Sequence, residues 1–247
     1  MAKYLADERM NIALGRMPKV TSLHKFGART GVATTTATIW DDGLSTYPWS
    51  VFDTAGVVTV TAANAADNSR IVTVVGLDAN FDSVTETITM SGGTGTGTVQ
   101  FKRVFRAYMR YDGANVGEIY IRRNGAGGTI VAQINAGNSQ TLMCVYTVPR
   151  NHTGLILKGV ATCSADKDMI IQFFGRFLED DGVSYTPFRI QHQANLYQNN
   201  YTYEFAVPLA LPEKTDLDVR VLGYSNDSGA HVSAAFDMVL YEVDTDY

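Results

Sequence analysis

Residues 205–221, FAVPLALPEKTDLDVRV, restrict the fold more than any other part of the chain. They contain two stretches in which apolar and polar residues alternate, separated by Pro212 and the polar residues after it. Such alternation is typical of a β-strand that buries one face. Because proline cannot donate a hydrogen bond to a sheet, we expect Pro208 and Pro212 at strand ends or on an edge strand. The segment therefore predicts two strands that are joined by a tight turn.

The chain repeats this pattern from residue 21 onward. Runs rich in Thr, Val, Tyr, Phe and Ile are broken by Gly, Asn, Asp or Ser at roughly the eight-to-twelve-residue spacing of β-sandwiches and barrels. A boundary near RYDGANV separates two β-rich halves. We therefore predict an all-β fold with two consecutive β-sandwich domains, residues 21–112 and 113–247. The second is expected to be jelly-roll-like, and a short helix or arm is expected at residues 1–20.

The last three predicted strands each have an inner and an outer face. The alternation assigns to the core Tyr201, Tyr203, Phe205, Val207, Leu217, Val219, Val221, Val232, Phe236, Met238 and Leu240. It assigns to the outer faces Thr202, Glu204, Ala206, Asp218, Arg220, Ser233 and Asp237.

Residues 4–15 are the one segment with a helical pattern, and Gly15 and Pro18 would end it. The apolar stripe is too thin to stabilise an isolated helix, so we expect an arm that needs a surface to lie on. The basic segment TSLHKFGART follows, and we expect it to join the arm to a first strand at residues 32–40. It would either contact an acidic neighbour or stay solvated. The candidate attachment residues are Tyr4, Leu5, Ile12, Leu14, His24, Lys25 and Arg29.

Charge and hydropathy exclude several classes of protein. The 247 residues carry a net charge of −5, whereas a nucleic-acid-binding protein usually shows a basic stripe. No apolar run approaches the ~18 residues that span a bilayer. The start of the chain lacks the apolar core of a signal peptide. We therefore expect neither nucleic acid nor membrane as a partner, and synthesis and assembly in a cytoplasm.

Two loops resemble ligand-binding motifs but do not complete them. Asp78, Asn80 and Asp82 begin a calcium-loop spacing, yet Ser83 stands where the loop needs Gly and Thr89 where it needs Glu. The glycine-rich SGGTGTGTV lacks the Lys of a phosphate-binding loop. We interpret the first as a polar hairpin loop and the second as a flexible loop between strands.

No constellation of catalytic or metal-binding residues emerges from the sequence. The four histidines are dispersed, and the acidic run at residues 179–181 precedes a glycine, as in a solvated turn. Cys144 and Cys163 lie in apolar runs and are expected to be buried small hydrophobic residues. We therefore predict a non-enzymatic protein with no cofactor and no metal.

Tyrosines cluster near NLYQNNY and could bind another molecule. Exposed rings would stack on sugars or on a protein neighbour, whereas rings on an inner face would only fill the core. The candidate surface-binding aromatics are Tyr185, Tyr197 and Tyr201.

Several segments taken together resemble a family of virion structural proteins of tailed bacteriophages. These segments are HKFGARTGVATTTATIWDDG, IVTVVGLDANFDSVTETITMSG, QTLMCVYTVPRNHTGLIL, LYQNNYTYEFAVPLALPEKTDLDVRV and VSAAFDMVLYEVD. The most specific piece is VPLALPEKTDLDVR with the preceding LYQNN, and the second is GLDANFDSVTET. The resemblance covers nearly the whole chain from about residue 20.

This resemblance implies a structural role in the virion. The expected function is an oligomeric accessory protein that decorates the head or builds the neck, tail or baseplate. Other virion proteins would be its partners, and assembly would take place in the cytoplasm of the bacterial host. The alternative is a receptor- or glycan-binding module of the tail, with a host-surface glycan as its ligand.

Overall fold

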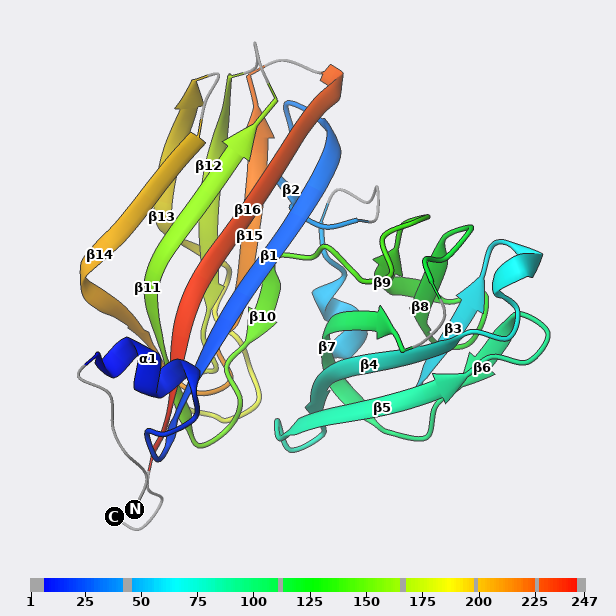
Figure 1. The fold of residues 1–247 in the computed structure, drawn as a ribbon. Coiled ribbons are helices and arrows are strands. Elements are labelled where there is room, and N and C mark those ends of the chain that lie inside the picture. Colours follow the sequence, from blue (N-terminus) through cyan, green and yellow to red (C-terminus); the bar gives the residue numbers. More distant parts are fainter. Residues whose placement is uncertain are drawn as a thin grey trace.

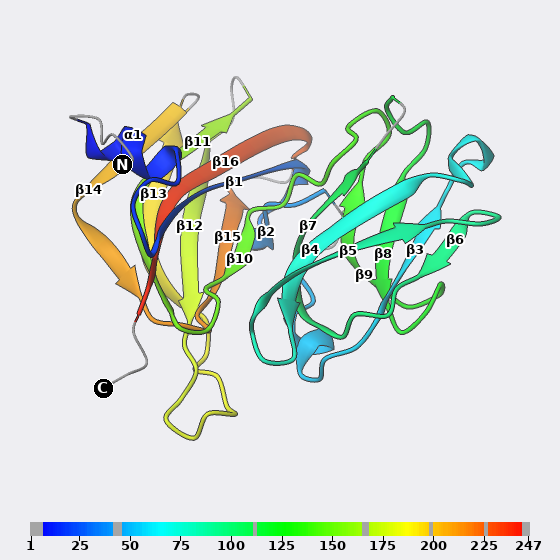
Figure 2. The same ribbon diagram turned by 60° about the horizontal axis from the view of Figure 1, so that its bottom comes forward.

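A computed structural model describes residues 7–41, 46–110, 113–164, 168–197, 200–224 and 227–243. This part of the chain is built almost entirely of antiparallel β-strands, which confirms the all-β prediction. The strands form four sheets, which Figures 1 and 2 show as two pairs that lie side by side.

The larger pair of sheets contains both the first and the last strand of the described chain. Its first sheet has the order β1 (Val20–Val32), β16 (Asp227–Glu242), β11 (His152–Cys163) and β14 (Asn200–Leu211). Its second sheet has the order β10 (Val145–Thr147), β15 (Asp216–Gly223), β12 (Asp168–Arg176) and β13 (Arg189–Tyr197), and β2 (Ala37–Thr38) pairs with β15.

The smaller pair is formed by the middle of the chain. One sheet has the order β6 (Thr94–Thr96), β3 (Val58–Ala62), β8 (Ile119–Arg123) and β9 (Thr129–Ile134). The other has the order β5 (Ser83–Thr89), β4 (Ile71–Asp78) and β7 (Phe101–Met109). Two short 3-10 helices, η1 (Trp49–Phe52) and η2 (Ala65–Asp67), lie in the connections.

Strand pairing does not follow the expected boundary at residue 113. β1 pairs with β16 over most of its length, and β8 pairs with β3. The physical reason is burial, because Val58, Val60, Ile119 and Ile121 are all fully buried in one sheet. Residues up to Ile134 therefore complete the smaller pair, and β1 belongs with the C-terminal strands.

The first strand begins twelve residues before the predicted one. We expected a linker at TSLHKFGART and a strand at residues 32–40, but β1 covers the linker and only β2 lies in the predicted range. β1 buries Lys25 and Arg29 on its inner face, where backbone carbonyl groups accept their hydrogen bonds. Gly27 lies between them, and a Cβ atom there would come within 2.5 Å of the Cys144 nitrogen.

The predicted inner faces are largely correct. Val232, Phe236, Met238 and Leu240 are buried, as are the core residues of β15. Val207 is 80% exposed instead, because the β11–β14 register shifts beside it. Asp218 lies on the outer face of β15 as predicted, yet it is fully buried under Thr38 and Trp49, which donate hydrogen bonds to it.

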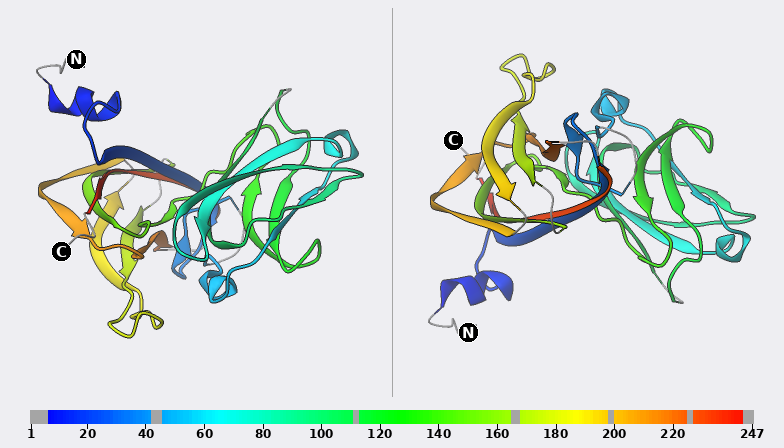
Figure 3. Two further views of the ribbon diagram at one scale, coloured as in Figure 1. Left: turned by 90° about the horizontal axis from the view of Figure 1, so that it is seen from below. Right: turned by 90° about the horizontal axis from the view of Figure 1, so that it is seen from above.

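The helix α1 (Glu8–Ala13) is shorter than the predicted residues 4–15. The Asp7 side chain caps it by accepting a hydrogen bond from the Arg9 nitrogen at 2.9 Å, and Gly15 follows its end at a φ of 63°. Tyr4 and Leu5 lie outside the described residues. Figure 3 shows α1 outside the sheet layers, joined to β1 by a short connection.

Candidate functional site

A buried ionic joint links the two pairs of sheets. Asp216 on β15 accepts two hydrogen bonds from Arg103 on β7, at 2.8 Å from Nε and 2.9 Å from Nη2. Arg176 Nε on β12 donates to the same carboxylate at 2.7 Å, and Thr147 Oγ1 does so at 2.6 Å. Asp216 is fully buried, and the Arg103 side chain is 3% exposed. Two guanidinium groups from different sheet pairs therefore share one carboxylate.

A second buried carboxylate lies two residues away. Asp218 accepts hydrogen bonds from Arg220 Nε at 2.9 Å, from Thr38 Oγ1 at 2.9 Å and from Trp49 Nε1 at 3.0 Å. Burial raises the pKa of Asp218, and the Arg220 charge opposes this rise. For Arg103, burial lowers the pKa, but the ion pair with Asp216 outweighs it, so the pKa is raised overall.

Aromatic rings cover the guanidinium groups of the joint. The guanidinium carbon of Arg176 lies 4.5 Å from the ring centre of Tyr185, 4.9 Å from Phe188 and 5.3 Å from Trp49. Such contacts between cations and rings are attractive, and they exclude water from the charges. Tyr185 therefore packs against the joint with its ring half-buried, and is not the free surface aromatic that we predicted.

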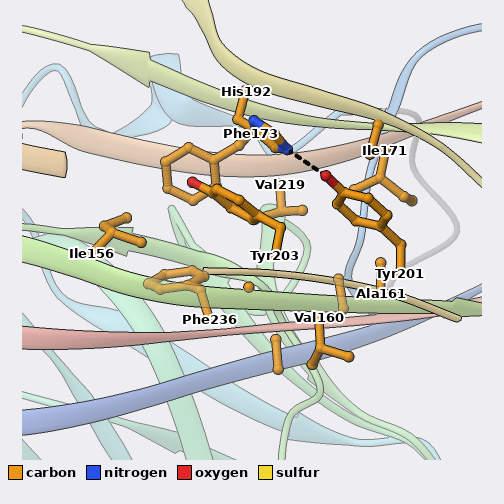
Figure 4. A pocket seen from close by; sticks show the side chains of 14 residues that line it. Ile156, Val160, Ala161, Ile171, Phe173, His192, Tyr201, Tyr203, Val219 and Phe236 are labelled. Atoms are coloured by element: carbon orange, nitrogen blue, oxygen red, sulfur yellow. Dashed lines mark hydrogen bonds between the residues drawn. The ribbon is translucent and has the colours of Figure 1, made fainter. Parts of the chain in front are cut away.

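A small apolar cavity lies between the facing sheets of the larger pair, near their β13 and β14 edges. Figure 4 shows aromatic rings on its walls, with Tyr201, Tyr203 and His192 on one side and Phe236 from β16 on the other. Its volume is about 40 Å³. An apolar cavity of about 150 Å³ binds one benzene molecule, so this cavity is too small for a sugar or a cofactor.

Aromatic rings beside the cavity stack on one another and join the edge strands β13 and β14. The His192 ring lies parallel to Tyr203, with centres 3.9 Å apart and an interplanar angle of 8°. The Tyr201 hydroxyl lies 3.4 Å from His192 Nε2. Burial lowers the pKa of His192, which favours the neutral imidazole that stacks best. Tyr201 is thus half-buried by its own fold, whereas Tyr197 is 62% exposed.

The structure separates the candidate attachment residues. Lys25 Nζ donates to the Phe105 carbonyl, and Arg29 Nη1 donates to the Thr38 carbonyl at 3.3 Å, so both face the interior. Their role as exposed attachment residues is therefore wrong. His24 remains accessible on the outer face of β1, with Nδ1 2.5 Å from Asp237 Oδ1. On the arm, Ile12 is half-buried and Leu14 is 57% exposed.

The two incomplete motifs are parts of the sheet framework. Asp78 Oδ1 accepts hydrogen bonds from the Asn80 and Asp82 nitrogens at 2.8 and 3.0 Å, which closes the β4–β5 hairpin as predicted. The glycine-rich segment contains strand β6, so it is not only a loop.

Within the described ranges, no group of three or more His, Cys, Asp or Glu is placed to hold a metal ion. Cys144 is a buried free thiol, and Cys163 is half-buried.

Sequence reasoning missed the ionic joint. Arg103 and Asp216 are 113 positions apart, and no local pattern links them. The one local signal was the pair of aspartates in TDLDVR, because two acids in an otherwise apolar strand need buried partners.

In the part of the chain that the structure describes, there is no helix of the length and hydropathy needed to cross a bilayer.

Comparisons with known proteins find little. No family model matches the chain, and no curated protein matches its sequence. Among solved structures, an infectious bursal disease virus structure (Gt strain) is 10% identical with a TM-score of 0.23, covering 97% of this chain and 81% of that chain. The VP2 subviral particle of infectious bursal disease virus is 11% identical with a TM-score of 0.20, covering 92% and 77%. Likeness at this level carries no argument about fold or function.

Proposed function

We propose that the protein is a non-enzymatic structural component of a bacteriophage virion. It would act as an oligomeric accessory protein that decorates the head or builds the neck, tail or baseplate, with other virion proteins as partners and assembly in the bacterial cytoplasm. The resemblance of residues 201–221 to tailed-phage virion proteins supports the context. In this proposal the two pairs of sheets are β-sandwiches, the larger one jelly-roll-like.

The observation that carries this proposal is the ionic joint. Arg103 reaches from the smaller pair of sheets to Asp216 in the larger one, and both side chains are buried. Bidentate pairing between Arg and a carboxylate fixes direction as well as distance, so it holds the two pairs in one orientation. A fixed orientation suits a subunit whose neighbours must meet it at set angles in a symmetric particle.

The arm is the proposed attachment element. Met10 on α1 and Leu14 directly after its end are 56% and 57% exposed, and a helix of six residues is too short to be stable without support. A neighbouring subunit that covers these side chains would stabilise the helix and bury apolar surface. His24 lies on the outer face of β1 and could add a polar contact.

Truncation of the arm tests the attachment. We expect that deletion of residues 1–18 abolishes incorporation into particles during infection, while the purified chain keeps its β-type circular dichroism and its cooperative unfolding. The double variant Met10→Asp, Leu14→Asp should reduce incorporation at least tenfold. Val183→Asp is the matched control, because Val183 is 80% exposed on a distant loop. Normal incorporation of the truncated chain would overturn the role of the arm.

The alternative function, a receptor- or glycan-binding module of the tail, rests on a different surface. Of the three aromatics that we assigned to it, Tyr197 alone is an exposed residue. The residues beside Tyr197 determine which kind of ligand this surface could bind.

A further inference from the structure

Two exposed tyrosines and a carboxylate form a row across three adjacent strands at one end of the larger pair. Asp168 on β12 is the direct partner of Tyr197 on β13. The Tyr224 nitrogen, just after β15, donates to the Asp168 carbonyl at 3.4 Å. Tyr197, Asp168 and Tyr224 therefore lie side by side, although 56 positions separate the first and the last in the sequence.

A second polar side chain lies beside this row. Asn195 is two residues before Tyr197 on β13, so it points to the same face of the sheet. The Tyr224 hydroxyl donates to Asn195 Oδ1 at 3.3 Å, which means that the Tyr224 ring reaches across β12 toward β13. Ile170 on β12 pairs with Asn195 and with Leu222, and both apolar side chains are half-buried between the polar ones. We call Asp168, Asn195, Tyr197 and Tyr224 the tyrosine patch.

The rings of the patch are not needed by the core. Tyr197 is 62% exposed and Tyr224 is 55% exposed, whereas Tyr201 and Tyr203 from the same part of the sequence are half-buried in the edge stack. Tyrosine offers a large, rigid and amphipathic surface at a small loss of conformational freedom, and it is therefore enriched in binding sites. Two exposed tyrosines beside hydrogen-bonding groups therefore indicate a surface that binds a ligand.

We infer that the tyrosine patch binds a neutral saccharide. The flat C–H face of a pyranose ring packs on a phenol ring, and the sugar hydroxyls need partners that both accept and donate. The Asp168 carboxylate supplies acceptors, and the Asn195 amide supplies both kinds of group. The core of a protein–protein interface is usually depleted of charged residues, whereas Asp168 lies between the two tyrosines here, beside the half-buried Ile170 and Leu222. Saccharide binding would be a function in addition to the structural role, and it does not depend on the arm.

The patch is open, so a single site should bind weakly. We expect a Kd on the order of 1 mM for one oligosaccharide, corresponding to about −4 kcal/mol. Several copies in one particle would raise the apparent affinity strongly, because the second contact becomes intramolecular. Weak single sites with many copies suit reversible adsorption to a cell surface.

Binding of the full-length chain to immobilised neutral hexose and N-acetylhexosamine oligosaccharides tests this inference. We expect binding that free oligosaccharide competes away, with Tyr197→Ala and Tyr224→Ala each weakening it at least tenfold. Asp168→Asn and Asn195→Ala should weaken it about threefold to tenfold. Tyr224→Phe should keep part of the binding, because the ring remains and only the hydroxyl is lost.

Tyr241→Ala is the matched control, since Tyr241 is 45% exposed on β16 in the other sheet. All variants should keep their unfolding midpoints, which separates a loss of binding from a loss of fold. Two results would overturn the inference: no saccharide binding by the wild-type chain, or binding that the patch variants leave unchanged. A third would be the binding of a protein at the patch that free oligosaccharide does not displace. Incorporation into particles should stay normal in every patch variant, so failure here leaves the structural proposal standing.

Discussion

Lys25 is buried in surroundings that change its ordinary chemistry. Burial lowers its pKa to about 7; the thiol of Cys144 partly opposes this, and Arg106 adds to it. Nζ still donates to the Phe105 carbonyl, and the Phe105 ring centre lies 5.7 Å away, so β1 contacts β7 through this side chain. A lysine that is neutral in the fold and charged in the unfolded chain links stability to pH.

We therefore predict that the free energy of unfolding rises with pH between about 7 and 10. In that range the unfolded chain binds a proton at Lys25 that the folded chain does not, which gives a slope of up to about 1.4 kcal/mol per pH unit. Urea denaturation at several pH values measures it. Lys25→Met should remove this part of the slope, while Lys158→Met, at an exposed position of β11, should leave it unchanged. Equal slopes in wild type and Lys25→Met would contradict the prediction.

Among the elements, β14 shows how an exposed edge is kept from pairing. Its register with β11 shifts between Ile156 and Lys158, and residues 205–208 lie in the irregular part. Pro208 in this part has no N–H group, and Figure 1 shows that β14 is bent along its length. Bulges and prolines on edge strands prevent the addition of a strand from another molecule. The sequence predicted this position for Pro208, and the structure confirms it.

Restoring a donor at this position should promote association. We predict that Pro208→Val increases the rate of aggregation severalfold at high concentration and leaves the unfolding midpoint nearly unchanged. Static light scattering during incubation at a temperature below the unfolding transition measures this rate. Val207→Lys, which adds a charge to the same edge, should slow aggregation. If Pro208→Val stays as soluble as wild type, the proline does not protect the edge.

How far each element could be predicted depends on where its information lies. Alternation within β14, β15 and β16 is local, so the strands and most of their inner faces were predictable. β1 was missed because Lys25 and Arg29 read as solvent-exposed, and their buried acceptors come from distant residues. Tyr185 was misplaced for the same reason, since the guanidinium groups that it covers are paired with Asp216. The sequence identified Tyr197 but not its neighbour Tyr224.

At the scale of the whole molecule, the ionic joint contributes both to the stability of the fold and to the orientation of the two pairs of sheets. Asp216→Asn would leave Arg103 and Arg176 buried without their shared countercharge. Breaking a buried ion pair in this way typically costs about 3–5 kcal/mol. We predict a loss of that size in urea denaturation at pH 7, with a transition that becomes broader as the two pairs of sheets unfold separately.

Asp180→Asn is the matched control for the joint, because Asp180 lies on an exposed turn of the same half of the chain. It should change the free energy of unfolding by less than about 0.5 kcal/mol. A second variant, Arg103→Met with Asp216→Leu, removes both charges and should recover part of the stability. If Asp216→Asn proves as stable as wild type, the joint does not hold the two pairs together.

The adjacency of β1 and β16 also determines the order in which the protein can mature on the ribosome. Every strand of the smaller pair precedes residue 135, so that half can close while translation continues. The opening strand of the chain must wait, with its lysine and arginine still hydrated, until some two hundred further residues have emerged. A nascent chain halted before β16 would thus carry one finished half and a first strand without its partner, so a premature stop codon before β16 would leave β1 unpaired.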